Sequence, residues 1–454
     1  MNNGSSAKKL TLITATLLAV GNIIGSGILG TLPAAVSVAG SKTFIGILVA
    51  AVNVFFTYFV LMIVCGVIPA NAGPYMYMTR LVHPWMVVFD MIERLKYFFL
   101  IALMGSIFSG YFTTLFPGVN GKAASIVIIL IFGLLNLYGI DAAAKVGNIL
   151  VVLLFISFML FSFYGLTVDL STIPDYVPDT GRTLNFATIG TVSALFATTL
   201  GGGQIVGEIA DQLENPGKNI MRAFTLAISI VVVIYSLMSF ATARVAGGAT
   251  FDTLSTIAKL VMPTGAFYLF MIGGAMAAIL TTINALIIST TAYLNRYAQD
   301  KVLPEAFGKK NSRGINTLNI MMTIVIPIII LLTNIHIGTL LAVCAVLVVF
   351  TALVKIIPAL LIEKKYPNAY RKANLHPAYS LIVVFVIIAA ALNLYSGVST
   401  IISTPGRIWG ILLALVVSFA VYFFARRAYL KSKGVDLDAE LRTVPESWTE
   451  AENS

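Results

Sequence analysis

The chain reads Gly-Asn-Ile-Ile-Gly-Ser-Gly-Ile from Gly21 to Ile28, in the middle of its first long apolar segment. A second glycine interruption, Gly201–Gly203, lies at the matching place in the second half of the chain. Backbone groups that such an interruption frees inside a bilayer cost several kcal/mol each unless protein, water or a ligand satisfies them. Paired interruptions at corresponding positions are typical of mid-membrane binding sites in carrier proteins.

The composition requires a protein that is embedded in lipid. Of the 454 residues, 58% are hydrophobic and only 11% are charged, whereas a soluble domain carries about 25% charged residues. At about 20 apolar residues per crossing, the length allows about twelve transmembrane helices with short loops. We expect these spans at 12–38, 44–69, 84–116, 123–139, 146–168, 186–210, 219–245, 263–294, 316–333, 337–362, 378–398 and 405–427.

The predicted fold class is an all-α polytopic membrane protein. The interruptions fall in spans 1 and 6, which is the spacing of a five-plus-five inverted repeat with two helices appended. We therefore expect one transmembrane domain over residues 1–430, with repeats at about 10–168 and 186–362 and helices 11 and 12 at about 378–427. Residues 431–454 are polar, and we expect them to form a mobile tail.

Charge sets the expected orientation. The polar stretches alternate between rich and poor in Lys and Arg, and an excess marks the cytoplasmic side. Both termini then lie in the cytoplasm of a multi-pass protein of the cell membrane, interpreted as a prokaryotic inner membrane. The net charge of +10 follows from this bias, and nucleic acid is not an expected partner. Cys65 and Cys344 lie in apolar runs, and we expect neither a metal nor a cofactor.

The interruptions offer chemistry for a small zwitterion. A half-helix that begins near Ile28 presents free N–H groups and a positive dipole end, which attract a carboxylate. The half-helix that ends near Ile23 offers carbonyls to an ammonium group. Phe196, Ala197 and Thr198 lead carbonyls into the second interruption in the same way. Close helix packing is the alternative role of these glycines.

Four motifs then occur in order: the run from Gly21 to Ile28 followed by Leu32-Pro33, and Ala72–Tyr77, Glu214–Ile220 and Asp300–Pro304. With them the chain resembles the amino acid–polyamine–organocation superfamily of transporters, and most of all its amino acid and amine antiporters. The resemblance covers spans 1 to 10. It implies a LeuT-like fold, a substrate at the two broken helices, and alternating access by rocking of spans 1, 2, 6 and 7.

The chain departs from parts of this family pattern. The lysine that sodium-independent members often carry in span 5 is absent, since Leu154 stands near that place. Gln204 replaces the glutamate that follows the span-6 break in antiporters of basic amino acids. Thr198 and Leu286 stand where guanidinium-binding members have tryptophans. These departures weaken an assignment to arginine or agmatine.

Span 3 carries charges deep in the membrane, where they are costly and usually functional. Two intrahelical pairs are expected, Asp90 with Arg94 and Glu93 with Lys96. Either these pairs only neutralise one another, or Arg94 faces the substrate path and binds a substrate carboxylate. Lys355 in span 10 is expected to snorkel to the inner surface, with a coupling role as the weaker alternative.

The predicted function is secondary active transport of amino acids or related amines, as an exchanger. The alternatives are a proton-coupled symporter, a channel or a non-transporting sensor; enzyme motifs are absent from the sequence. The expected partners are a small-molecule substrate and the lipid bilayer. A homodimer, with a second copy of the chain as partner, is left open as an alternative. Glu208 and Lys355 are candidate coupling or gate residues. The candidate substrate-binding residues are Ile23, Gly25, Ser26, Gly27, Ile28, Arg94, Tyr97, Phe98, Thr198, Gly201, Gly202 and Gln204.

Overall fold

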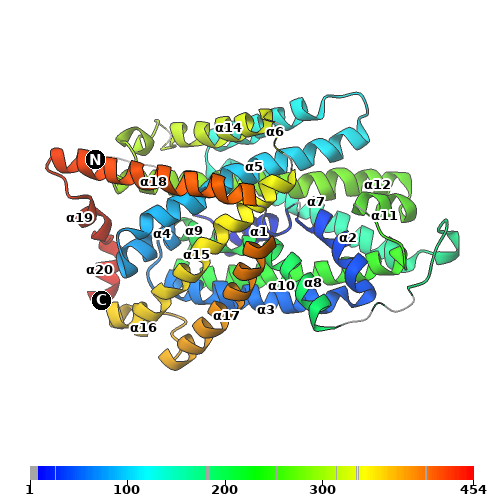
Figure 1. Ribbon diagram of the computed structural model, residues 1–454, viewed down its shortest axis with the longest axis horizontal. Helices are drawn as coiled ribbons and strands as arrows, with labels where there is room; N and C mark the ends of the chain where they lie inside the picture. The colour runs from blue at the N-terminus through cyan, green and yellow to red at the C-terminus, as the bar shows by residue number, and fades with distance from the viewer. Residues whose placement is uncertain are drawn as a thin grey trace.

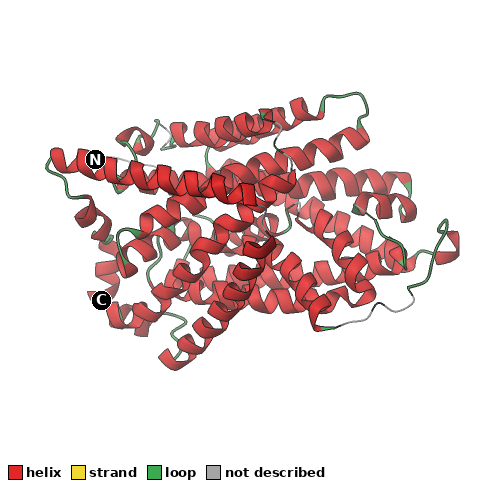
Figure 2. Ribbon diagram, viewed as in Figure 1, coloured by secondary structure: helices red, strands yellow, loops and turns green. Residues whose placement is uncertain are grey.

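The computed structural model is built of helices joined by loops (Figure 2). It describes residues 9–25, 27–179, 182, 185–251, 253–312, 314–333, 335, 337–403 and 406–453. In this part of the chain the β pairing is limited to two isolated bridges, Leu10 with Leu213 and Asn71 with Ile209. The all-helical prediction is therefore confirmed.

Helices occupy every segment in which we expected a membrane crossing. They are α1 (Leu12–Ile23), α2 (Gly27–Ala39), α3 (Thr43–Val67), α5 (Met86–Leu115), α6 (Gly121–Leu137), α7 (Ile140–Thr167), α8 (Phe186–Leu200), α9 (Ile205–Glu208), α10 (Pro216–Ala246), α12 (Thr264–Leu269), α13 (Ala277–Gln299), α14 (Thr317–Leu332), α15 (Ile337–Lys365), α17 (Tyr379–Ser403) and α18 (Gly406–Ser432). Eight helical stretches of the described chain are long and apolar enough to cross a membrane, and further apolar helices are shorter. The chain is thus a polytopic membrane protein, and the count of twelve crossings stays a prediction.

Shorter helices lie in the connections. They are α4 (Gly73–Tyr77), η2 (Met78–Val82), α11 (Leu254–Val261), η7 (Glu305–Gly308), α16 (Pro367–Lys372), α19 (Leu437–Arg442) and α20 (Glu446–Asn453).

Local sequence explains where several helices begin and end. The Asn185 side chain accepts a bond from the Thr188 amide and the Thr188 hydroxyl accepts one from the Asn185 amide, which is a capping box at the start of α8. Pro216 stands in the first turn of α10, where its missing N–H costs nothing. Gly139 separates α6 from α7 at φ 120°, a conformation that L side chains rarely adopt.

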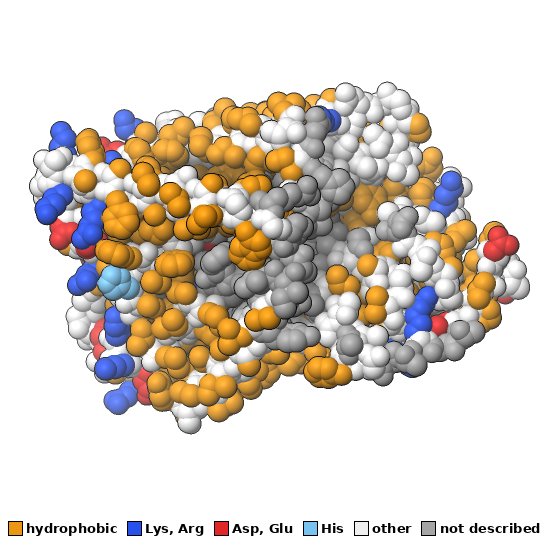
Figure 3. All heavy atoms as spheres, in the orientation of Figure 1, with side chains coloured by type: hydrophobic (Ala, Val, Ile, Leu, Met, Phe, Trp, Pro, Cys, Tyr) orange, Lys and Arg blue, Asp and Glu red, His pale blue; other side chains and the backbone are white. Residues whose placement is uncertain are grey.

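Most of the long helices run lengthwise through the molecule (Figure 1). At its centre α1 packs against α7, α10 and α13. We call the end at which α4, α16, α19 and α20 lie the α20 end; Lys and Arg side chains gather there, and an apolar band covers the flanks (Figure 3). The broken helices α1–α2 and α8–α9 are therefore held within a helical bundle.

The tail corrects one expectation. We predicted that residues 431–454 are mobile, but α18 extends to Ser432 and is followed by α19 and α20. Leu437 and Leu441 are buried, and Trp448 is 0% exposed. Leu437 and Leu441 are four residues apart and share one face of α19, and Trp448 adds a buried contact from α20, so apolar side chains anchor an otherwise polar segment.

Candidate functional site

The first break lies between α1 and α2. Helix α1 ends at Ile23 and α2 begins at Gly27, while Ser26 lies outside the described residues. A Cβ on Gly25 would approach the Thr282 hydroxyl oxygen to 2.3 Å, and one on Gly27 would approach Cγ2 of Thr199 to 2.4 Å. Neighbouring helices thus come so close to the broken backbone that glycine is required at both positions.

Hydroxyl groups satisfy the carbonyls that precede the first break. Thr281 and Thr282 donate to the Gly21 carbonyl at 3.0 and 3.2 Å, and Tyr235 donates to the Ile23 carbonyl at 3.2 Å. Ile23 is buried at the end of α1, and Ile28 is fully buried on α2. These two carbonyls are thereby partnered, as a membrane interior demands.

The second break differs from our prediction of an unwound gap. After α8, Gly201–Gln204 forms a tight 3-10 turn (η4), which continues into α9 and leaves the helical path at Ile209. A Cβ on Gly202 would lie 2.6 Å from the Asn22 carbonyl oxygen, and the Asn22 side-chain amide donates to the Gly202 carbonyl at 2.7 Å. The glycines therefore allow the two breaks to touch one another. Thr198 belongs to α8, but its side chain lies outside the described residues.

A cluster of six buried charges lies beside the second break. Both predicted pairs on α5 are confirmed: Arg94 approaches Asp90 to 3.5 Å, and Lys96 approaches Glu93 to 2.5 Å. Arg94 also pairs with Glu93 at 3.1 Å and, across the bundle, with Glu208 of α9 at 3.0 Å. With Lys355, these residues form what we call the charge cluster.

Lys355 corrects a second expectation, because it does not snorkel to the surface. Its ammonium group lies 2.5 Å from Oε1 of Glu93, and the residue is buried. The side chain therefore points into the protein, since Glu93 offers the acceptor that an ammonium group needs when it is removed from water. Lys355 thus joins α15 to α5 at the charge cluster.

The charge cluster contains equal numbers of acids and bases. Asp90, Glu93 and Glu208 face Arg94, Lys96 and Lys355, and each of the six is at most 7% exposed. Desolvation costs several kcal/mol per ion, so the cluster persists only because its members are paired and hydrogen-bonded. Removing one member leaves a partner charge buried and uncompensated.

Tyr97 and Gln204 connect the charge cluster to the second break. The Tyr97 hydroxyl donates to Glu208 at 2.5 Å and accepts from Arg94 at 2.7 Å and from the Gln204 side chain at 3.2 Å. Gln204 is the last residue of η4 and so follows the glycine triplet directly. Phe98, the next residue on α5, is buried but contributes only an apolar ring.

Helix α13 adds three residues that we did not predict. Ser289 donates to Glu208, the Tyr293 ring lies 4.0 Å from the Arg94 guanidinium carbon, and Tyr297 donates to Asp90 at 2.5 Å. Their spacing of four residues puts them on one helix face. Polar residues repeated at this period within an apolar span are the signal that points to them.

Some buried polar atoms in the site have no hydrogen-bond partner within the described part of the chain. They include Oε1 of Gln204, the hydroxyl of Tyr293 and Nε of Arg94. Buried polar groups are normally satisfied by protein or ordered water, so these three atoms are open to a partner that the described chain does not supply.

A second ion cluster lies nearer the α20 end. Asp300 pairs with Arg80 at 2.8 Å and Arg296 at 2.7 Å, and accepts from the Tyr75 hydroxyl at 2.5 Å. Burial opposes the charge of Arg80, but Tyr75 and Asp300 outweigh it and raise the pKa of the guanidinium. The Tyr75 ring meets Tyr297 edge-on at 4.9 Å, which connects this cluster to Asp90.

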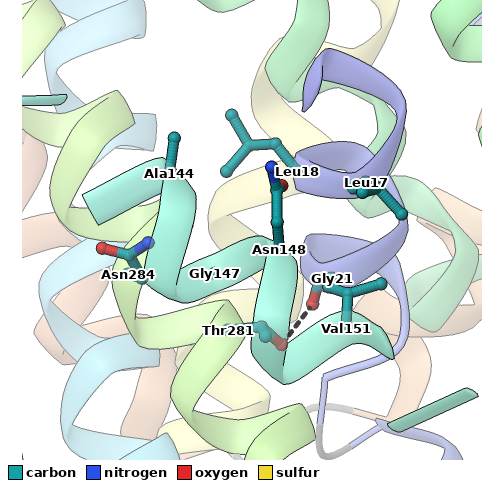
Figure 4. Close-up of a pocket in the computed structure, with 9 residues that line it drawn as sticks. All are labelled: Leu17, Leu18, Gly21, Ala144, Gly147, Asn148, Val151, Thr281 and Asn284. Atoms are coloured by element: carbon teal, nitrogen blue, oxygen red, sulfur yellow. Dashed lines mark hydrogen bonds between the residues drawn. The ribbon is translucent and has the colours of Figure 1, made fainter. Parts of the chain in front are cut away.

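A small cavity lies between α1, α7 and α13, where Gly21, Val151 and Thr281 line it (Figure 4). Its volume of about 10 Å³ is room for about one water molecule. Asn284 lines it, accepts from Asn136 at 3.0 Å and donates to the Ala143 carbonyl at 2.9 Å. The cavity is thus far smaller than a substrate site. In the described residues, no group of three or more His, Cys, Asp or Glu is placed to hold a metal ion.

Comparison with known proteins identifies the family. The profile of the family described as "Amino acid permease" matches residues 10–424. An uncharacterized protein of Methanocaldococcus jannaschii is 29% identical over 321 residues, which cover 67% of this chain and 71% of that protein. Uncharacterized transporters of Mycobacterium bovis and Mycobacterium tuberculosis are each 24% identical over 307 residues, covering 65% of this chain and 67% of theirs. The chain therefore belongs to the amino acid permease family, within the superfamily that its motifs indicated.

Proposed function

We propose that this permease is a secondary transporter of amino acids or closely related amines, and that it binds them between the two broken helices. The observation that carries the proposal is the contact of these breaks with each other and with the charge cluster through Gln204 and Tyr97. Helix ends, a guanidinium and a carboxylate then lie within one small region. Together they match the ammonium and carboxylate groups of an amino acid.

Binding would exchange internal hydrogen bonds for bonds to the substrate. The Ile23 and Gly202 carbonyls are held by Tyr235 and Asn22, and both are acceptors suited to an ammonium group. The amides at the start of α2, near Gly27 and Ile28, suit the carboxylate. Separation of α1 from η4 would release the Gly202 carbonyl, and separation of α1 from α10 would release the Ile23 carbonyl. Opening of the site and binding are therefore coupled.

Arg94 and Gln204 set the side-chain preference in this proposal. Glu208 pairs with Nη1 of Arg94 at 3.0 Å, and a substrate carboxylate could take its place there. Gln204 places a neutral amide at the second break, whereas a carboxylate in its place would favour cationic substrates. We therefore propose neutral or acidic amino acids as the preferred class, with Ser26 and Thr198 as further contacts.

Exchange follows if the carrier reorients slowly when it is empty and faster when substrate is bound. The second candidate function is proton-coupled symport, which the pairing of Glu208 with Arg94 favours. Protonation of Glu208 would release Arg94 for the substrate, and return of the empty carrier would need the proton to leave. Glu208→Gln then abolishes uptake driven by a pH gradient but leaves counterflow.

We propose that both termini lie in the cytoplasm and that the chain resides in the cell membrane of a prokaryote. The gathering of Lys and Arg at the α20 end supports this orientation (Figure 3).

The test is counterflow in proteoliposomes that contain the purified protein and a panel of unlabelled amino acids and amines. Labelled solute should enter only when the lumen holds a cognate solute, and the active pair names the substrate. Uptake into empty vesicles under an inward proton gradient would instead indicate a proton-coupled symporter. Non-saturable flux through the same vesicles would contradict both and indicate a channel.

A further inference from the structure

The C-terminal tail binds to several separate segments of the α20 end. The Trp448 ring is fully buried, stacks on Tyr77 with centroids 5.7 Å apart and meets Tyr366 edge-on at 5.9 Å. Its indole N–H donates to the Pro69 carbonyl at 3.3 Å. The tail is thus anchored by a residue of the kind that dominates binding at protein interfaces.

Polar contacts fix the rest of the tail. The Glu452 carboxylate accepts from the backbone amides of Asn368 and Ala369, at 3.1 and 3.0 Å, in the first turn of α16. Glu440 pairs with Lys301, and the Thr443 carbonyl accepts from Nε of Arg80 at 3.1 Å. The tail therefore bridges the loops that follow α3, α13 and α15.

The segment held by Trp448 is itself bonded to the end of the second broken helix. The Ala72 amide donates to the Glu208 carbonyl at 2.7 Å, and Asn71 pairs with Ile209 in an isolated bridge. A Cβ on Gly73 would lie 2.7 Å from the Gly207 carbonyl oxygen. Residues 69–77 thus cover α9 at the α20 end, with the tail on their outer side.

We propose that residues 437–453, comprising α19 and α20, form a strap that holds the segment Pro69–Tyr77 against α9 and keeps the α20 end of the substrate path closed. Release of the strap frees this segment to leave α9, which lets Glu208 and the second break open toward that end. The strap therefore regulates access to the site. Its consequence for transport rests on the proposed function, whereas the closure itself does not.

A native thiol reports on this closure. Cys65 lies near the end of α3 and is fully buried between α9 and the segment, since its Sγ is 4.0 Å from the Gly207 carbonyl oxygen and its thiol interacts with the Tyr77 side chain. The sequence contains only one other cysteine, Cys344, so Cys344→Ser leaves Cys65 as the single thiol. Labelling of this protein in lipid nanodiscs with a maleimide measures how often the segment leaves α9, and it needs no substrate.

Trp448→Ala should raise the labelling rate of Cys65 by about tenfold, because it removes the buried anchor of the strap. Glu452→Gln should raise it less, since the neutral amide is a weaker acceptor for the α16 amides. Glu450→Gln is the matched control, because Glu450 lies exposed on the same helix, and it should label at the rate of the parent protein.

Two further measurements keep the proposal falsifiable. A chain that ends at Gly434 lacks the strap altogether, and labelling of Cys65 at the parent rate in this chain would overturn the proposal. The Cys65→Ser variant tests whether removal of the strap loosens the whole protein. Its single thiol, Cys344, is buried beside the Lys96 carbonyl. Equal acceleration at Cys344 and Cys65 would also overturn it, whereas acceleration at Cys65 alone supports it. Absence of counterflow in the parent protein would count against the proposed function, and the labelling test of the strap would still stand.

Discussion

Arg94 illustrates at the scale of a residue how a full charge is accommodated within a membrane domain. Its guanidinium lies near three carboxylates, of Asp90, Glu93 and Glu208, and above the ring of Tyr293. Lys96 and Lys355 return the cluster to neutrality through Glu93. The cluster is therefore a coupled unit in which the effect of one substitution depends on the others.

A double-mutant cycle tests this coupling. Arg94→Gln and Glu208→Gln each leave an unpaired buried charge and should each destabilise the protein by about 3–5 kcal/mol. The double variant restores neutrality and should melt above both single variants in detergent. Glu214→Gln, at an exposed position after α9, serves as the control and should melt like the parent. Additive losses in the double variant would show that the two residues act independently.

Gly202 is the residue at which the two breaks meet, and it allows the second residue-scale prediction. In Gly202→Ala the new methyl group meets the backbone carbonyl of Asn22, which cannot move aside as a side chain can. We expect a loss of about 1–3 kcal/mol from overpacking and loss of counterflow. Gly110→Ala is the control, because nothing lies within 4 Å of its added Cβ. Normal counterflow in Gly202→Ala would contradict close contact of the breaks.

At the scale of elements, polar side chains join helices that hydrophobic packing alone would leave free to slide. Lipid tails are as apolar as leucine, so association within a bilayer depends on close packing and interhelical hydrogen bonds. Asn284 of α13 connects α6 and α7 in this way, through Asn136 and the Ala143 carbonyl. The Ser157 hydroxyl of α7 likewise donates to the Leu269 carbonyl at 3.1 Å, where α12 passes into the π-helical turn η6 (Phe270–Met276).

Asn284→Ala should therefore weaken the packing of three helices. It removes both bonds and leaves the side-chain amide of Asn136 with one acceptor fewer, for a loss of about 1–2 kcal/mol. The loss is measured as a lower melting temperature in detergent. Ser418→Ala is a suitable control, because among the described residues that hydroxyl bonds within its own helix, to the Ala414 carbonyl at 2.7 Å. Equal melting of the two variants would rule out a bridging role for Asn284.

At the scale of the whole molecule, charge and hydrophobicity divide the surface by region. Basic side chains gather at the α20 end and apolar side chains cover the flanks (Figure 3). Such a distribution orients a protein in its membrane, because loops rich in Lys and Arg remain on the cytoplasmic side. The strap lies at the same end, so in this orientation it is exposed to the cytoplasm.

Reporter fusions in a bacterial host test the orientation. A fluorescent protein fused after Ser454 should fluoresce, because it folds in the cytoplasm, and alkaline phosphatase fused within the loop 169–179 should be active, because it requires the outer side. The same two reporters exchanged between the sites provide the controls and should both be silent. The reverse pattern would place the α20 end outside.

Much of the fold was predictable because its causes are local. Apolar runs long enough to cross a bilayer mark the helices, and glycines mark the first break between α1 and α2. The pairs Asp90–Arg94 and Glu93–Lys96 follow from helical spacing alone. Each of these features depends on residues within about one turn or one span of each other, so the sequence contains the information directly.

The tertiary structure decided which distant residues meet. Arg94 and Glu208 are 114 positions apart and Glu93 and Lys355 are 262 apart, and no local period relates them. The second break is a tight turn in contact with Asn22, and burial of Trp448 shows that the tail is docked. By itself the sequence determined a helical membrane protein with two breaks, because hydrophobicity and helix spacing are local. The neutral charge cluster and the strap required the packed chain, because a buried charge is stable only beside the partner that the fold brings to it.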